Sequence, residues 1–341
     1  MKLGIWTPLP HVIRDGPGFE PPPADDATGR DALGRDRAFQ YALDTVQAAE
    51  RHGFDITLIA ERLLGPDLEA WILAAALAAA TQRIELMVAV HPGIVTPQMV
   101  AKMGATLDRI SAGRAAVNVV AGWWQEEMDL FGNGTWLGAA EQRAARLEEF
   151  VRVLKTLWTQ GEASFDGTYF NVARTSLQPR PWRAAGPPIF AASRSPEGKD
   201  VVARYCDWWF AEYKPGYRLF EANLDAVARD VREMGERADR AGRGLDYGLS
   251  AHVICTETMA EAVARADELE AYGKQDRKAL RIASSLGAGL VGTPEVIAAR
   301  IRQYQEIGIG CLMLRFHPMF EDMELFAARV MPLLGRAPQS A

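Results

Sequence analysis

The chain has 341 residues, 48% of them hydrophobic, and a formal net charge of −6. It is therefore long enough to bury a large core, and it lacks the dense basic face that nucleic-acid binding usually needs. The longest apolar run, Ala70–Ala80, is shorter than the ~20 residues of a membrane-spanning helix, and no secretory signal is visible. Cys206, Cys255 and Cys311 have no metal-like spacing, which favours reduced, buried thiols. We expect a cytoplasmic protein that binds neither nucleic acid nor membranes.

Short β-rich runs alternate with longer amphipathic stretches along the whole chain. The eight predicted strands are Lys2–Thr7, Phe54–Ala60, Ile84–Val90, Ala115–Ala121, Pro188–Ala192, Trp208–Ala211, Leu249–Cys255 and Cys311–Arg315. The predicted helices are Arg37–His52, Asp67–Thr81, Gln98–Ser111, Glu141–Thr159, Glu197–Tyr205, Phe220–Ala241, Met259–Tyr272, Pro294–Ile307 and Met323–Leu334. Strands that alternate with helices indicate parallel βαβ units, and eight of them in this length predict one closed (β/α)₈ TIM barrel spanning residues 1–341.

Four segments interrupt the alternation and are expected to be insertion loops. They cover about residues 11–36, 123–140, 164–178 and 273–292, and the third contains a hairpin-like Asp166-Gly167. Active sites of such barrels are built from loops at the carboxyl ends of the strands, and long loops are usually functional or disordered. The alternative is that these loops are disordered or make contacts between subunits.

Two of the five histidines fall where predicted strands end, and a third lies within a strand with an ambiguous direction. His91 ends the third strand, His252 lies in the seventh, and His317 follows the eighth. Together at one barrel mouth they would serve proton transfer at neutral pH. Singly, each is more often a core or turn histidine. The sequence shows no Gly-x-Gly-x-x-Gly after a strand, no P-loop and no metal-ligand cluster.

Polar and aromatic residues on other strands suggest a binding site. Asn118 interrupts an apolar strand, where its amide would bond either a neighbouring loop or a polar heterocycle. Tryptophans that could wall an apolar pocket or simply fill the core lie on or just after strands: Trp6, Trp123, Trp124, Trp208 and Trp209.

Ser193-Arg194-Ser195-Pro196 joins the fifth strand to a helix. Ser195 suits the N-cap, and Pro196 suits the first helical position. The amides of a helix start bind phosphate, and Arg194 would add charge, although a plain N-cap has the same sequence pattern.

Several longer stretches resemble one family. They are Val90–Arg114, Val117–Glu127, Leu147–Trp158, Ile189–Phe210 and Leu290–Leu334. In this order they are similar to the bacterial luciferase-like flavin monooxygenases, and in particular to the dimethylsulfone, alkanesulfonate and pyrimidine monooxygenases. The resemblance implies a TIM barrel that binds reduced FMN supplied by a separate NAD(P)H-dependent flavin reductase. It also implies activation of O₂ as a flavin peroxide, and oxygenation or cleavage of a small organosulfur compound, a sulfone or a sulfonate. Relatives of this kind are homodimers or homotetramers and serve sulfur metabolism.

The resemblance also implies roles for individual residues. Glu61 and Arg62 should approach the flavin, Asn118 should bond its ring edge, and Glu127 should lie beside it. The flavin phosphate should be bound by Arg143 and by the turn of Ser193, Arg194 and Ser195. The substrate-binding residues are expected to be Trp6, Trp123, Trp209 and Arg315, and the catalytic ones His91, His252 and His317.

Departures from the family pattern concern the phosphate and the substrate. Ala144 replaces a tyrosine near the phosphate, and Ala192-Ser193 replaces paired glycines. The alkanesulfonate enzymes have an arginine where this chain has Ser250, and another in the loop that corresponds to Ser284–Leu286, which contains none. Their third-strand arginine is replaced here by His91. A sulfonate favours arginine forks, so these losses argue for a less acidic substrate.

Two other functions stay open from the sequence. One is a deazaflavin- or flavin-dependent oxidoreductase on the same barrel, which would transfer hydride and need no oxygen. The other is a flavin-binding relative without turnover.

Overall fold

A computed structural model describes residues 1–7, 33–64, 67–122, 124–275 and 284–336. Eight strands close into a barrel in the order β1-β12-β9-β8-β7-β4-β3-β2, and every pairing in it is parallel. They are β1 (Lys2–Trp6), β2 (Ile56–Ile59), β3 (Glu85–Val90), β4 (Ala115–Val119), β7 (Ile189–Ala191), β8 (Trp208–Phe210), β9 (Asp246–His252) and β12 (Ile309–Arg315). The predicted (β/α)₈ barrel is confirmed.

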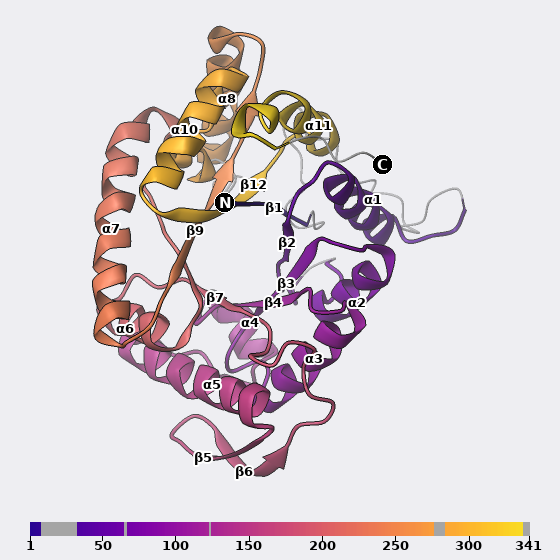
Figure 1. The fold of residues 1–341 in the computed structure, drawn as a ribbon, viewed down its shortest axis with the longest axis vertical. Helices are drawn as coiled ribbons and strands as arrows, with labels where there is room; N and C mark the ends of the chain where they lie inside the picture. The colour runs from indigo at the N-terminus through magenta and orange to yellow at the C-terminus, as the bar shows by residue number, and fades with distance from the viewer. Residues whose placement is uncertain (8–32, 65–66, 123, 276–283, 337–341) are drawn as a thin grey trace.

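Helices surround the strands (Figure 1). They are α1 (Arg37–Arg51), α2 (Ala70–Ala80), α3 (Pro97–Ile110), α4 (Gln125–Leu130), α5 (Ala140–Gln160), α6 (Pro196–Tyr205), α7 (Phe220–Arg240), α8 (Met259–Gln275), α10 (Pro294–Glu306) and α11 (Met319–Arg329). Short 3₁₀ turns are η1 (Tyr217–Leu219), η2 (Ser285–Ala288) and η3 (Pro332–Leu334). Gly53 and Gly113 follow α1 and α3 with φ of 86° and 89°, as helix-ending glycines do.

The insertions carry structure of their own. A hairpin of β5 (Glu162–Asp166) and β6 (Asn171–Ser176) lies outside the helical ring, next to α5 (Figure 1). The short α4 lies within the second predicted insertion, and η2 within the fourth. Most of the first insertion, residues 8–32, lies outside the described residues.

The seventh predicted strand is divided. The barrel strand β9 ends at His252. After Val253, the chain forms β10 (Ile254–Cys255), which pairs with β11 (Val291–Gly292) in a separate two-stranded sheet. Because Val253 interrupts the pairing, His252 is the last barrel residue of this strand. It therefore lies at the carboxyl end, where barrel active sites form.

Side chains fill the barrel in layers. At the amino end, Lys2 Nζ lies 2.7 Å from Glu85 Oε2 and 5.8 Å from the centroid of the Trp208 ring. The middle is an apolar cluster of Ile56, Leu58, Met87, Ala89, Ala116, Phe190, Cys311 and Met313. Since alternate strand residues face the same side, the inward register continues to Trp6, His91, Asn118, Ser250, His252 and Arg315. The carboxyl end of the interior is therefore polar, whereas the middle is apolar.

Candidate functional site

Trp6 and Arg315 are in contact at the carboxyl end of the barrel. The Trp6 indole Nε1 donates to Ser250 Oγ at 2.9 Å, and the Arg315 guanidinium carbon lies 3.8 Å from the centroid of the Trp6 ring. The Tyr213 hydroxyl donates to the Ser250 carbonyl, which ties the segment after β8 to β9. These contacts hold an aromatic face and a cation at the barrel mouth.

His252 lies beside this group, because it pairs in register with Arg315. Its side chain is 1% exposed, and neither ring nitrogen has a hydrogen-bond partner among the described residues. Burial, followed by electrostatic interactions with His317, Arg315 and Arg265, holds the pKa of His252 well below its ordinary value. The imidazole is therefore neutral and has one donor and one acceptor available to a ligand. Buried polar groups are normally hydrogen-bonded, whereas none of the residues that the structure describes bonds this ring.

Asn118 is half-buried on β4, between Ala89 of β3 and Phe190 of β7. No hydrogen bond recorded among the described residues involves its side-chain amide. An inward-facing amide whose donors and acceptor bond no described residue suits either a neighbouring loop or the polar edge of a heterocycle, the two roles that the sequence left open.

The segment after β2 is held by Glu127 of α4. Glu127 Oε1 accepts from Arg62 Nε at 3.0 Å and from the backbone amides of Leu63 and Leu64 at 3.2 Å each. The Arg62 guanidinium also lies over the Trp124 ring, 4.1 Å from its centroid. Arg62 and Glu127 thus shape one wall of the mouth, and their charges compensate each other.

Glu61 is predicted from the sequence to approach the flavin. Its carboxyl faces the start of α2, where it hydrogen-bonds the Ala70 amide and the Glu69 side chain. The residue is 8% exposed, and Oε1 has no partner among the described residues. Burial, followed by the Glu69 charge, raises the pKa of Glu61 to about 8, so this carboxyl is mainly protonated at neutral pH.

The histidine triad predicted from the sequence is only partly brought together. The His91 imidazole hydrogen-bonds the backbone of Glu61 and Val120, and burial lowers its pKa. Those bonds join the ends of β2 and β4, which is a supporting role. His317 follows β12, and its carbonyl accepts from Arg265 Nη2 at 2.7 Å. His252 is the histidine whose ring is best placed to act on a ligand.

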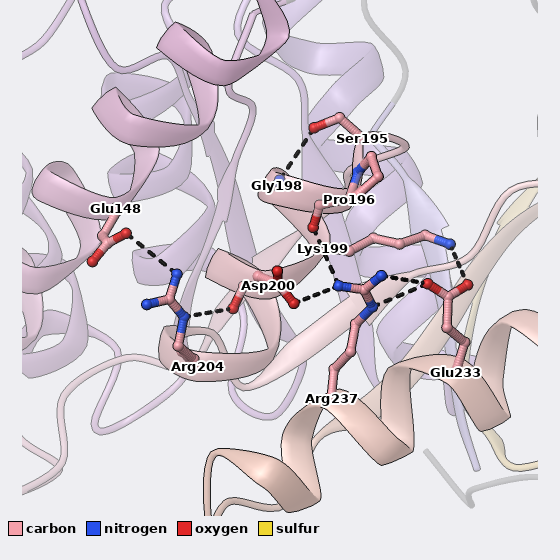
Figure 2. Close-up of polar contacts among 9 residues, drawn as sticks. All are labelled: Glu148, Ser195, Pro196, Gly198, Lys199, Asp200, Arg204, Glu233 and Arg237. Carbon is pink, nitrogen blue, oxygen red and sulfur yellow. Dashed lines mark hydrogen bonds and ion pairs between the residues drawn. The ribbon is translucent and has the colours of Figure 1, made fainter.

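The predicted phosphate turn lies at the start of α6. Ser195 caps this helix by accepting from the Gly198 amide at 3.1 Å (Figure 2). A Cβ added at Gly198 would fall 2.0 Å from Ser193 Oγ, so glycine is what lets the Ser193 hydroxyl lie over the first turn. Arg194 is 84% exposed and forms an ion pair with Glu212.

A network of ion pairs fixes α6 to α7. Glu233 binds both Arg237 and Lys199, at 2.8 and 2.9 Å, and Arg237 also pairs with Asp200 and reaches the Pro196 carbonyl at 3.4 Å (Figure 2). The first turn of α6 therefore has a fixed position. Hydroxyls and amides held in this way can receive a phosphate group.

Arg143 belongs to the first turn of α5. Its Nη1 donates to the carbonyls of Leu137 and Gly138 at 2.8 and 2.7 Å. A Cβ at Gly122, just after β4, would lie 2.7 Å from Arg143 Cδ, so this arginine lies close to the carboxyl end of β4. Ser193, Ser195 and Arg143 have the chemistry to hold a flavin phosphate, and Asn118 and His252 have the chemistry to bond the polar edge of a ring.

Of the predicted substrate residues, Trp209 lies away from the barrel interior, and Trp123 cannot be compared. Trp209 is 2% exposed and belongs to the outer core between strands and helices, whereas its neighbours Trp208 and Phe210 pack with the barrel interior. Trp123 lies outside the described residues. Tyr213 and Glu69 are site residues that the sequence did not single out. The available signal for Tyr213 was its position three residues after β8.

Within the described ranges, no three His, Cys, Asp or Glu side chains gather to hold a metal ion. No helix in the part of the chain that the structure describes is long and apolar enough to cross a membrane.

Comparisons with known proteins show the family and the fold. The chain is 31% identical over 333 residues to the FMNH₂-dependent dimethylsulfone monooxygenase of Pseudomonas putida, covering 88% of this chain and 89% of that protein. Its fold is similar to a riboflavin lyase crystallised with modified FMN and riboflavin (TM-score 0.76, 18% identity, 98% of this chain and 91% of that one). It is also similar to an F420-dependent secondary alcohol dehydrogenase bound to an F420-acetone adduct (TM-score 0.72, 17% identity, 98% of this chain and 99% of that one). The family model of the luciferase-like monooxygenases matches residues 20–311, and the chain therefore belongs to that family.

Proposed function

We propose that this chain is a two-component monooxygenase that receives reduced FMN from a separate NAD(P)H-dependent flavin reductase and oxygenates a small sulfone or sulfonate. The observation that carries the proposal is His252, a buried neutral imidazole at the polar end of the barrel whose ring nitrogens bond none of the described residues. Similarity to a dimethylsulfone monooxygenase over most of the chain supports the substrate class.

Each part of the mouth has a separate task in this proposal. Ser193, Ser195 and Arg143 hold the phosphate, and Asn118 orients the polar edge of the ring. When bound, reduced FMN supplies the electrons that reduce dioxygen. The apolar layer beneath keeps water out of the interior, which protects an oxygen-reactive cofactor from unproductive oxidation.

His252 and Arg315 are proposed to act on the substrate. The neutral imidazole donates a hydrogen bond to a sulfone oxygen or accepts a proton at its unprotonated nitrogen. A protonated His252 imidazolium would have no nitrogen left to accept a proton. Arg315, stacked on Trp6, stabilises negative charge on the substrate oxygens.

The test combines purified protein with FMN, a generic flavin reductase, NADH, oxygen and a panel of small sulfones and sulfonates. Oxygen-dependent formation of sulfinate, sulfite or aldehyde supports the proposal. Absence of substrate consumption, with only hydrogen peroxide formed, contradicts it. The likeness to an F420-dependent dehydrogenase motivates a second arm, in which tighter binding of the deazaflavin than of FMN, with hydride transfer, would replace the monooxygenase assignment.

We also propose that the protein is a homodimer or homotetramer. The outer faces of α2 and α3 expose apolar side chains, with Ile72, Met99 and Ile110 each more than half exposed. A second copy of the chain would cover them. Sedimentation analysis of the wild-type protein and of Ile72→Glu, which should dissociate the oligomer, tests this proposal.

A further inference from the structure

Trp6 extends across a neighbouring strand. It ends β1, yet its indole nitrogen bonds Ser250 of β9, and β12 lies between those two strands. The side chain therefore runs along the inner face of the barrel past one complete strand. Its edge is fixed at the far end by the 2.9 Å hydrogen bond.

The face of the same indole is fixed by the strand that it crosses. Arg315 is the inward-facing residue of β12 at this height, and its guanidinium carbon lies 3.8 Å from the Trp6 ring centroid. A hydrogen bond at the edge and a cation on the face leave the ring little rotational freedom.

The layer below prevents the ring from sinking into the barrel. Gly4 is the preceding inward position of β1, and a Cβ there would lie 2.6 Å from both Ile56 Cγ2 and Met313 Sδ. Those two side chains occupy the space under the indole. Trp6 itself is only partly buried, so its remaining surface faces the carboxyl end of the barrel.

From this arrangement we infer that Trp6, held by Ser250 and Arg315, sets the upper size of the substrate. The inference rests on the proposed function for the location of the site. A rigid indole beside His252 leaves room for short alkyl groups and excludes longer ones. The favoured ligands are small molecules with a polar oxygen and short alkyl arms, such as dimethyl sulfone.

The experiment measures binding by calorimetry to the FMN-loaded, oxidised protein, so that no turnover is needed. Two series are compared, dialkyl sulfones and dialkyl ketones, each from dimethyl to dipropyl. In wild type, affinity should fall with arm length. In Trp6→Ala, the ratio of the affinity for the dimethyl compound to that for the dipropyl compound should fall at least about 10-fold. The reason is that one extra methylene group changes binding to a packed pocket by about that factor.

Two further variants complete the design. Ser250→Ala removes only the hydrogen bond to the indole and should give a smaller change in the same direction. Trp182→Ala is the matched control, because that tryptophan is exposed on the surface, and its affinity ratio should equal that of wild type.

The outcomes separate the inference from the proposed function. If wild type oxidises no sulfone but the ketone series shows a size limit that Trp6→Ala removes, the inference stands and the sulfone assignment fails. If dimethyl sulfone is oxidised and folded Trp6→Ala keeps the wild-type size limit, the inference is wrong. If neither the sulfones nor the ketones bind to the wild-type protein, the inference is also wrong.

Discussion

Replacing Glu61 by glutamine should remove a pH-dependent loss of stability. Its carboxyl is buried beside Glu69, and burial followed by that neighbouring charge raises its pKa from 4.5 to about 8. An acid with a raised pKa binds its proton more tightly in the folded state than in the unfolded chain. Its contribution to folding is therefore complete below pH 4.5 and is lost as the pH rises through about 8.

The size of this loss follows from the two pKa values. At about 1.4 kcal/mol for each pH unit, the full rise from 4.5 to about 8 amounts to at most ~5 kcal/mol. Glutamine has nearly the same shape and carries no charge, so Glu61→Gln should gain stability relative to wild type as the pH rises from 5 to 8.

The assay is urea unfolding of both proteins at several pH values from 5 to 8, with the free energy of unfolding compared at each. Glu50→Gln is a control of opposite sign. Burial acts to raise the pKa of Glu50, but hydrogen bonds from the backbone of Ile84, Arg83 and Gln82 outweigh it and lower the pKa. That variant should lose stability at neutral pH. Parallel stability curves for wild type and Glu61→Gln would refute the reasoning.

Three other variants test the site. Glu127→Ala leaves Arg62 buried without its partner, so urea unfolding should show a loss of about 3–5 kcal/mol, and part of it should be recovered when Arg62→Met is added; a loss near zero would contradict the pairing. His252→Leu breaks no hydrogen bond recorded in the described chain, so stability should stay within about 1 kcal/mol of wild type while substrate oxidation is lost, and retained oxidation would contradict the assigned role. Ser195→Ala and Thr96→Ala each remove a helix N-cap and should each cost about 1 kcal/mol, but only Ser195→Ala should weaken FMN binding measured by fluorescence quenching; equal binding by both would contradict the phosphate turn.

The barrel strands could be predicted from the sequence because their apolar runs and their spacing by helices follow from burial on both faces. The direction of side chains could not always be predicted. β8 is Trp-Trp-Phe, so its three residues show no polar alternation, and the sequence gives no reason to prefer Trp208 over Trp209 as the inward residue. The break at Val253, which makes His252 a strand-end residue, depends on pairing with a segment nearly forty residues away.

The site was predictable to a similar degree. Asn118 and His252 were recognisable because a polar residue in an apolar strand has few explanations. The Glu61–Glu69 contact was not, since it depends on how α2 approaches the end of β2. The Trp6–Ser250 bond joins residues 244 positions apart, and it became visible only with the barrel closed.

The ion pair of Lys2 and Glu85 and the packed apolar layer above it close the amino end of the barrel interior. Under the proposed function, the described residues leave the carboxyl end as the entrance for cofactor, dioxygen and substrate. A reactant bound deeper would then have to enter before, and leave after, the one that covers it. Entry and release would therefore limit the rate of turnover as much as the chemical step.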